Sequence, residues 1–468
     1  MFVGRKKELK LLDELINSKK FEMLIMHGRR RVGKSYLLSN FANKYIDSTI
    51  FFTADKSNEK SNVKRFINEL KKVVNVGDYI NSIESWNDLF SLLNDVVIDK
   101  RLMIIIDEFT YLYNSNSAFD SILQNAIDNI FKKKNIFLIL CGSEVSVIEE
   151  IIDNSSKPLY GRKTCDLKIE PFTYYEAKEF FPNYTNEEVL IVYSILGGIP
   201  LYLSLFDDTK SIKENIIRNC LSTNGYLFNE PNTVLRMELN ETQFYKDIMI
   251  AISSGSSTFN DISTKIYDEK AKVAKYLKVL INLGIIEKEV PCGEKENSRN
   301  SLYKIADNYF AFWFKFIYKN QSMLNGLIDP KIYYDLEINK ENLNRFLGYR
   351  FEKICMQYLK KKSYEGKLGF YPYQIGRWWG NNKVLKKEDE IDIIALGKEK
   401  ILLSECKYTS SLFDNKELND LLDSSKAFNN KIVDIMIFSK SGFTKEVIKR
   451  CNDNNYKMIN LDNLFDIN

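Results

Sequence analysis

The sequence predicts an α/β protein whose N-terminal part is a parallel β-sheet covered by helices. Over residues 1–235, short apolar runs rich in β-branched residues alternate with stretches of helical periodicity, which is typical of strands connected by helices. The apolar runs are nearly continuous, as expected for strands buried on both faces. The expected strands are EMLIM (22–26), TIFFTA (49–54), LMIIIDEF (102–109), IFLILCGS (136–143) and CDLKIEPF (165–172).

Three further segments are expected after this core, which we predict to end at residue 172. Residues 173–235 have a wholly helical pattern and predict a small helical subdomain. Residues 236–318 hold three helical stretches, a predicted β-hairpin and a buried aromatic helix, and the three helices followed by a hairpin suggest a winged helix. Residues 319–468 begin with a helix and continue with strand-like runs, so a last α/β domain is expected there.

The composition excludes several classes of protein. With 67 Lys+Arg against 63 Asp+Glu, the net charge of +4 requires any nucleic-acid partner to be recognised by a local site. Seven cysteines without a CxxC pair favour reduced thiols over disulfides or zinc. No apolar run reaches the roughly 18–20 residues that cross a bilayer, and the N-terminus is charged where a signal peptide is apolar. We therefore expect a cytoplasmic protein without membrane contact.

A phosphate-binding loop is predicted where the first strand runs into GRRRVGKS, residues 28–35. The pattern G-x-x-x-x-G-K-[ST] stands between a strand and a helix, which is the context that it needs. Its glycines allow backbone N–H groups to surround a phosphate, Lys34 is expected to contact the β- and γ-phosphates, and Ser35 is expected to bind Mg²⁺. The predicted nucleotide-binding residues are Gly28, Arg29, Arg30, Arg31, Val32, Gly33, Lys34, Ser35 and Tyr36, without individual roles for the three arginines.

Four further side chains are candidates for the chemistry of this site. Asp107 ends a buried strand and can hold the Mg²⁺ shell, and Glu108 is placed to orient or deprotonate the attacking water. Ser143, at the end of the next strand, could reach the γ-phosphate or the water, or could simply cap the strand. Arg162 is a candidate arginine finger that would act within the chain or across a homo-oligomer interface, with an ordinary surface arginine as the alternative.

A family resemblance covers residues 2–203. FVGRKKEL, GRRRVGKS, IIIDEF, LCGSEVS, PLYGR and GGIPLYL, in this order, resemble the archaeal-type ATPases related to the AAA+ and STAND groups. The resemblance implies ATP as the substrate, a position for the Asp107 strand away from both sheet edges, and a helical lid. It also implies a P-loop NTPase sheet with this lid, followed by a winged helix and an α/β nuclease-like domain.

A second group of charged residues lies in a predicted β-hairpin near the C-terminus. The strands 391–396 and 401–407 flank a turn-prone stretch, and if that turn is symmetric, Asp392 lies opposite Glu405. Opposed like charges destabilise a strand pair, and alternation places Lys407 on the face of Glu405. A divalent cation would relieve the repulsion between the carboxylates.

The Asp…Glu-x-Lys spacing resembles the PD-(D/E)xK nucleases. This resemblance implies Asp392 and Glu405 as Mg²⁺ ligands, Glu352 as the acid that completes the site, and Lys407 as the catalytic lysine that orients or activates water. A solvated hairpin is the structural alternative.

The sequence therefore predicts an ATP-binding, Mg²⁺-dependent ATPase that acts on or with DNA. In this hypothesis ATP turnover is coupled to a winged helix and to a metal-dependent nuclease-like domain. The alternative is a STAND-like switch, in which the nucleotide controls a C-terminal domain that binds a partner without cleaving it.

Overall fold

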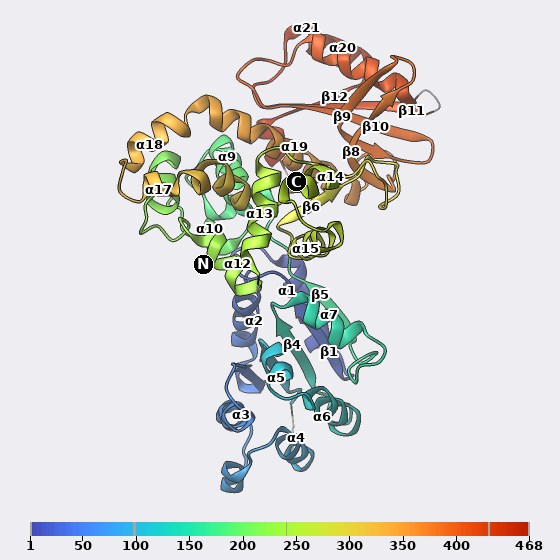
Figure 1. The fold of residues 1–468 in the computed structure, drawn as a ribbon. Helices are drawn as coiled ribbons and strands as arrows, with labels where there is room; N and C mark the ends of the chain where they lie inside the picture. The colour runs from blue at the N-terminus through green and yellow to red at the C-terminus, as the bar shows by residue number, and fades with distance from the viewer. Residues whose placement is uncertain (1, 97–99, 240, 429–430, 467–468) are drawn as a thin grey trace. The chain divides into compact units, whose positions relative to one another are not determined.

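The protein divides into two compact units (Figure 1). The computed structural model describes residues 2–96, 100–239, 241–428 and 431–466. The first unit consists of Met1–Pro171 with Ile199–Leu201, and the second of Phe172–Gly198 with Tyr202–Asn468. Each unit contains a five-stranded sheet, which confirms the predicted α/β fold class. None of the described helices combines the length and the apolar character needed to span a membrane.

The sheet of the first unit is parallel, in the order β2-β3-β4-β1-β5. Because β3 lies between β2 and β4, the expectation that the strand of Asp107 is not an edge strand is confirmed. Of the run predicted at 165–172, only the first four residues form a strand. The strands are β1 (Glu22–His27), β2 (Thr49–Thr53), β3 (Met103–Asp107), β4 (Phe137–Gly142) and β5 (Cys165–Lys168).

An aromatic cluster fills the core on one side of this sheet. Trp86 is surrounded by the rings of Phe52, Phe66, Phe90 and Phe119, whose centroids lie 5.5 to 5.8 Å from its own. All five side chains are buried, so the cluster joins helices α3, α4 and α6 to strand β2. The helices of the unit are α1 (Lys6–Ile16), α2 (Lys34–Ala42), α3 (Glu59–Val73), α4 (Trp86–Asp95), α5 (Thr110–Ser115), α6 (Phe119–Ala126) and α7 (Val145–Asp153).

The chain enters the second unit through a close backbone contact. Phe172 N–H donates to the carbonyl of Gly198 at 2.8 Å, and a Cβ at Gly198 would lie 1.8 Å from the carbonyl oxygen of Phe172. Only glycine fits at this position. The helices from here to residue 238 are α8 (Tyr174–Ala177), α9 (Asn186–Leu196), α10 (Pro200–Leu203), α11 (Ile212–Ile216) and α12 (Glu230–Glu238), as the wholly helical pattern predicted.

Three helices and a two-stranded antiparallel sheet follow, in the order predicted for a winged helix. The aromatic run after them is a buried helical segment, as expected. The polar atoms of two of its side chains donate hydrogen bonds to backbone carbonyls of the protein. Trp313 Nε1 donates to the carbonyl of Phe228 at 2.7 Å, and the Tyr309 hydroxyl donates to that of Leu227 at 2.6 Å. The elements are α13 (Thr242–Ser253), α14 (Phe259–Ile266), α15 (Lys270–Asn282), β6 (Ile286–Glu289), β7 (Leu302–Ile305), α16 (Asn308–Phe312) and η6 (Trp313–Ile317).

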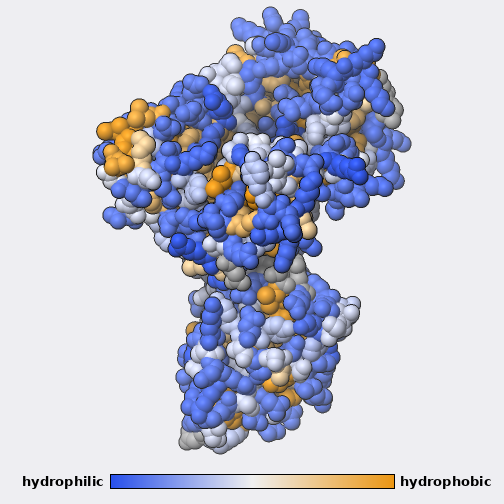
Figure 2. Space-filling model, viewed as in Figure 1, coloured by the Kyte–Doolittle hydropathy of each residue, from blue (hydrophilic) through white to orange (hydrophobic). Residues whose placement is uncertain are grey.

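Exposed apolar side chains gather around the next two helices, α17 (Gln321–Leu324) and α18 (Pro330–Glu337). Figure 2 shows them as an orange patch on an otherwise largely hydrophilic face. Ile332 and Leu336 stand one turn apart on α18 with 56% and 59% of their surface exposed. Leu327, between the helices, is 80% exposed, so this part of the second unit presents an apolar surface.

The last part of the second unit is a mixed sheet in the order β12-β11-β10-β9-β8. Strands β8, β9 and β10 are antiparallel neighbours, whereas β10, β11 and β12 are parallel. Ile401 pairs with Leu396 and Ser404 with Ile393, so the hairpin turn is symmetric, as expected. The elements are α19 (Lys340–Tyr364), β8 (Gln374–Asn382), β9 (Lys387–Leu396), β10 (Lys400–Lys407), α20 (Asn415–Ser424), β11 (Ile432–Ser439), α21 (Lys445–Asn454), β12 (Lys457–Asn460) and α22 (Leu461–Phe465).

Buried ion pairs join the β6–β7 hairpin to α19. Glu289, with 10% of its side chain exposed, pairs with Lys353 of α19 and lies 3.2 Å from Lys304 Nζ of β7. Burial alone would raise the pKa of Glu289, but the two ammonium charges outweigh it and lower the pKa from 4.5 to about 2. The segment just after β6 also meets β8, where Cys292 N–H donates to the carbonyl of Arg377 at 2.8 Å.

We expect Glu289→Gln to destabilise the second unit in a pH-dependent way. The pKa of Glu289 in the folded protein lies below its unfolded value, so its ion pairs contribute fully above the unfolded pKa of 4.5 and are lost as the pH falls toward 2. At neutral pH the variant should lose about 3 kcal/mol of unfolding free energy, because two buried ammonium groups lose a partner. The difference from the wild type should shrink as the pH is lowered through the acidic range.

Denaturant unfolding followed by circular dichroism at several pH values measures this difference. Glu296→Gln, at an exposed position of the same hairpin, is the matched control and should change little. A difference that stays constant with pH would contradict the assigned ion pairs.

Candidate functional site

The turn from β1 into α2 has the backbone of a phosphate-binding loop. Gly28 and Gly33 have φ values of +145° and +90°, in the region that favours glycine. A Cβ at Gly28 would lie 2.5 Å from the carbonyl oxygen of Ile169, so a larger residue would push the loop off the chain that follows β5. Arg31, inside the loop, also has a positive φ of 70°.

Arg5 holds this loop in place from outside. Its guanidinium donates to the carbonyl of Val32 in the loop and to that of Glu170 after β5, both at 2.8 Å. Arg5 is 5% exposed and also pairs with Glu8 at 3.2 Å. It is therefore a positioning residue that the sequence analysis did not assign, although it belongs to the motif FVGRKKEL.

Lys34 turns its ammonium group back into the loop. Nζ donates to the carbonyls of Gly28 at 2.7 Å and Arg29 at 3.0 Å, and the residue is 6% exposed. Ser35 and Tyr36 follow on the exposed first turn of α2. Arg29, Arg30 and Arg31 are partly buried between Gly28 and the buried Val32, so the predicted nucleotide-binding residues form one continuous loop and helix start.

The acidic residues predicted at strand ends meet at the same edge of the sheet. In the registers of the parallel strands, Asp107 of β3 is level with Cys141 of β4, and His27 of β1 with Gly142. The carboxyl ends of these strands therefore open on one edge, where the loop begins. Ser143 Oγ donates to the Glu108 carboxylate at 3.1 Å.

Glu108 is held by local backbone geometry as well. It has a positive φ of 54°, and its N–H donates to Asp107 Oδ1 at 3.1 Å. Asp107 itself is 3% exposed. A backbone conformation of this kind costs free energy in a residue other than glycine, which is typical of functional sites.

These residues fit Mg-ATP. The loop would supply backbone N–H groups and one ammonium to phosphates, and the Ser35 hydroxyl and Asp107 carboxylate are of the hard oxygen type that Mg²⁺ prefers. Glu108, with Ser143 at its carboxylate, is the group that would orient or deprotonate water.

Arg162 lies in a structural ion pair. Its guanidinium donates to Asp128 Oδ2 at 2.7 and 3.1 Å and to the carbonyl of Tyr160 at 3.2 Å. The contact with Arg162 lowers the pKa of Asp128. The role of Arg162 as an arginine finger, within the chain or in a homo-oligomer, stays a prediction.

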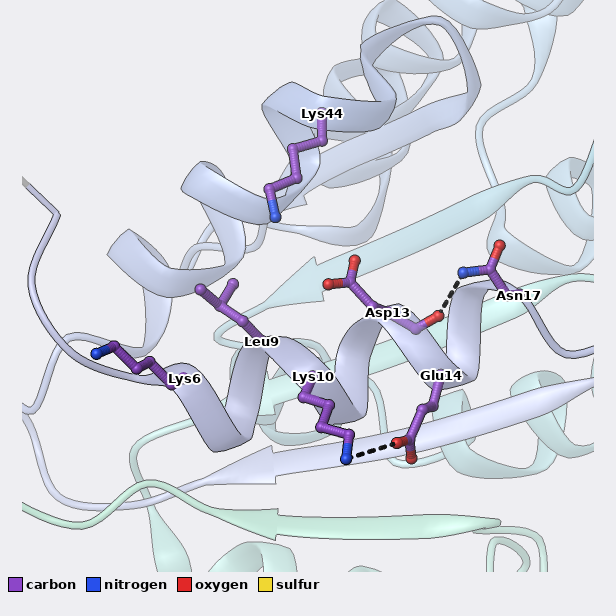
Figure 3. Close-up of a pocket in the computed structure, with 7 residues that line it drawn as sticks. All are labelled: Lys6, Leu9, Lys10, Asp13, Glu14, Asn17 and Lys44. Carbon is purple, nitrogen blue, oxygen red and sulfur yellow. Dashed lines mark hydrogen bonds and ion pairs between the residues drawn. The ribbon is translucent and has the colours of Figure 1, made fainter. Parts of the chain in front are cut away.

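A surface hollow of about 580 Å³ along α1 is lined by none of these residues (Figure 3). The Lys44 side chain points into it from the opposite segment, and Leu9 lies between. Among its lining residues, Lys10 pairs with Glu14 at 3.9 Å, and Asn17 Nδ2 donates to the backbone carbonyl of Asp13 at 2.7 Å.

Three carboxylates converge in the last sheet of the second unit. They come from α19 (Glu352), β9 (Asp392) and β10 (Glu405). Burial raises the pKa of each carboxyl group, the charge of Asp392 raises the pKa of both glutamates further, and Glu352 adds to the rise at Glu405. Asp392 Oδ2 also accepts the N–H of Cys406 at 2.9 Å. Across the described ranges, no three His, Cys, Asp or Glu side chains are placed so that together they could hold a metal ion.

Lys407 is engaged with α20 and the loop before it. Its ammonium pairs with Glu417 and donates to the carbonyl of Leu412 at 3.0 Å. Glu417 was not predicted as part of the site, because it comes from a helix whose packing against β10 the hairpin pattern does not reveal.

Arg377 is a second residue of this site that the sequence analysis missed. The pairing of β8 with β9 shifts between Gly376 and Trp378, and such a bulge redirects the side chain at that point. Arg377 pairs with Glu390 at 2.8 Å, and its charge lowers the pKa of Glu352 and Asp392 against the effect of burial. The only sequence signal was an arginine beside the predicted hairpin.

The fold and the loop define a P-loop ATPase, and comparisons with known proteins agree. Residues 2–206 match a family described as an ATPase domain predominantly from Archaea, and residues 313–421 match "Archaea bacterial proteins of unknown function". An uncharacterized protein of Methanocaldococcus jannaschii is 32% identical over 415 residues, 87% of this chain and 88% of that protein. The chain therefore belongs to the family of this relative, and its N-terminal part is the archaeal ATPase domain.

Shorter relatives and solved structures are similar to parts of the chain. An uncharacterized ATP-binding protein of M. jannaschii is 45% identical over 53 residues, 11% of this chain and 90% of that protein. The Walker-type ATPase of Pyrococcus abyssi has 21% identity and a TM-score of 0.49 over 67% of this chain and 96% of its own. The ORC2 protein of Aeropyrum pernix has 11% identity and a TM-score of 0.42 over 66% and 91%.

Lys34→Ala should weaken ATP binding by at least about tenfold, or about 1.4 kcal/mol. The ammonium neutralises phosphate charge, and without it the carbonyls of Gly28 and Arg29 also lose their donor. Titration with a fluorescent ATP analogue measures the affinity. Lys10→Ala, on an exposed lysine of α1, is the control and should bind like the wild type; equal affinities for both variants would refute the role of Lys34.

Glu108→Gln should bind Mg-ATP normally and hydrolyse it about 10²- to 10⁴-fold more slowly, because the amide keeps the shape but cannot accept a proton. Asp107→Asn should instead weaken Mg²⁺-dependent binding. Phosphate release and nucleotide affinity, measured on the same samples, separate the two effects. Glu14→Gln on α1 serves as the control, and wild-type turnover by Glu108→Gln would exclude Glu108 as the base.

Proposed function

We propose that the protein couples ATP hydrolysis in its first unit to Mg²⁺-dependent cleavage of DNA in its second. The observation that carries the cleavage proposal is the convergence of Glu352, Asp392 and Glu405, whose pKa values are all raised and two of which are raised further by the charge of Asp392. Like charges held together in a buried place are stabilised when they share a cation. The motif Asp…Glu-x-Lys supports the same assignment.

The chemistry supplied by the chain would then be positioning and charge compensation. Asp392 and Glu405 would hold Mg²⁺, with Glu352 completing the site, and the ion would polarise the phosphodiester and its attacking water. Arg377 is suited to bind a phosphate oxygen, because its Nε is buried and has no hydrogen-bond partner among the described residues. To act on the attacking water, the Lys407 ammonium would have to leave its ion pair with Glu417.

The three-helix and hairpin segment supports DNA as the partner, if it functions as a winged helix. Its third helix, α15, carries Lys275 and Lys278 three residues apart, and both are exposed. Exposed lysines on one helix face suit a phosphate backbone. The segment just after β6 is engaged with β8 through Cys292, and α15 is the expected DNA-contacting element.

One observation favours the alternative, a nucleotide-controlled switch that binds a partner without cleaving it. The proposed catalytic lysine, Lys407, forms an ion pair with Glu417 of α20. In this alternative the second unit keeps the fold and the charge cluster but has no nucleolytic activity.

Cleavage of plasmid DNA with Mg²⁺ or Mn²⁺, in the presence and absence of ATP, decides between them. Glu405→Gln should abolish cleavage and leave ATP hydrolysis intact, because the two sites lie in separate units. Glu399→Gln, at the exposed hairpin turn, is the matched control and should cleave normally. Lys407→Ala should retain metal binding and lose cleavage, since the ammonium acts on water and not on the ion. A wild type that binds DNA but never cuts it would favour the switch.

A further inference from the structure

A cavity of about 340 Å³ in the second unit lies apart from the residues assigned above. Its walls come from the end of α13 and the loop after it, from β7, from the aromatic segment α16–η6, and from α19. This volume is near the lower end of the range of small-ligand pockets, about 300–1,000 Å³.

The cavity is lined by four cationic side chains, Lys304, Lys315, Arg345 and Arg350. Among the described residues that line it there is no aspartate or glutamate. The other polar lining groups include the serines at 253, 256 and 257, which are neutral hydrogen-bonding residues. The cavity thus presents positive charge and hydroxyl groups together.

Two of the four cations are compensated from outside the cavity. Lys304 pairs with Glu289 at 3.2 Å, and Arg345 pairs with Glu341 at 2.9 Å in an exposed contact. Exposed pairs of the second kind contribute little and exchange readily. Arg345 can therefore turn to a ligand at small cost.

The other two cations form no ion pair with any described residue. Arg350 is 6% exposed, and both of its terminal nitrogens donate to one backbone carbonyl, that of Ile305, at 3.1 Å. A guanidinium this deeply buried normally faces a carboxylate or another anion. Lys315, at an exposed position, lies over the rings of Phe316 and Phe346.

The electrostatics agree with this geometry. Burial lowers the pKa of Lys315, and the charges of Arg345 and Arg350 lower it further. Burial likewise lowers the pKa of Arg350, while the charges of nearby carboxylates, including Glu287 and Asp307, act in the opposite direction. Arg345 and Arg350 therefore repel Lys315, and an anion placed between these three cations would relieve that repulsion.

We propose that this cavity binds a phosphate-bearing ligand of up to nucleotide size. Arginine and lysine together with hydroxyl groups are the usual ligands of phosphate oxygens, and Arg350 offers a planar fork of donors for them. The phosphate would come from a free nucleotide or from the phosphorylated end of a nucleic-acid strand. This site is independent of the carboxylate cluster, so it stands whether or not the protein cleaves DNA.

Isothermal titration of the full chain with pyrophosphate tests the proposal. Pyrophosphate also suits the P-loop, so the diagnostic signal is a binding event that survives Lys34→Ala. In that background, Lys315→Glu should weaken the event at least tenfold, and Arg345→Gln should weaken it severalfold. Lys319→Glu makes the same charge reversal at an exposed residue of the next turn, outside the cavity, and should leave it unchanged within twofold.

Competition identifies the source of the phosphate. Displacement of pyrophosphate by AMP indicates a free nucleotide, and displacement by a 5′-phosphorylated but not a 5′-hydroxyl oligonucleotide indicates a strand end. Retained ATP hydrolysis by Lys315→Glu shows that this variant is folded. Equal pyrophosphate affinity for Lys315→Glu and Lys319→Glu, or no binding event that survives Lys34→Ala, would overturn the proposal.

Discussion

The close approach of the P-loop to the chain after β5 is the constraint on which the nucleotide site depends. Gly28 lies so near the carbonyl of Ile169 that any side chain would separate them, and Arg5 ties the same two segments together through Val32 and Glu170. The loop is therefore fixed by backbone packing before any nucleotide binds. Because the loop is already ordered, phosphate binding does not have to offset the entropic cost of ordering it.

In the second unit, buried charged groups constrain the structure, and the pKa of buried carboxyl groups shifts in opposite directions at two places. Between the β6–β7 hairpin and α19, Glu289 is compensated by Lys353 and Lys304, and its pKa falls. At the carboxylate cluster beyond, Glu352 and Asp392 are compensated only in part by Arg377, and their pKa values rise. A compensated pair stabilises the fold, whereas an uncompensated group favours a ligand of opposite charge.

Sequence patterns predicted what depends on local periodicity and turn symmetry. The five strands of the first sheet, the P-loop and the register of the β9–β10 hairpin follow from such patterns, and the register ends with Ser404 opposite Ile393, next to Glu405 and Asp392. Contacts between distant segments could not be predicted this way. Arg377 reaches the carboxylates through a bulge, Lys407 is drawn to Glu417 by the packing of α20, and Arg162 meets Asp128 across 34 residues of chain.

Coupling between ATP and the second unit requires a segment whose conformation both sites influence. The chain passes between the units around residues 171–172, 198–199 and 201–202. Ile199–Leu201 belongs to the first unit, where Pro200 lies 3.7 Å from the position of a Cβ on Gly33. The neighbouring Gly198 is held in the second unit by its contact with Phe172, which admits no side chain. A movement of the P-loop would therefore act on Pro200, and Pro200 is joined through Ile199 to Gly198, which the contact with Phe172 holds in place. In the proposed coupling, Gly198-Ile199-Pro200 is the segment best suited to carry such a movement to the second unit.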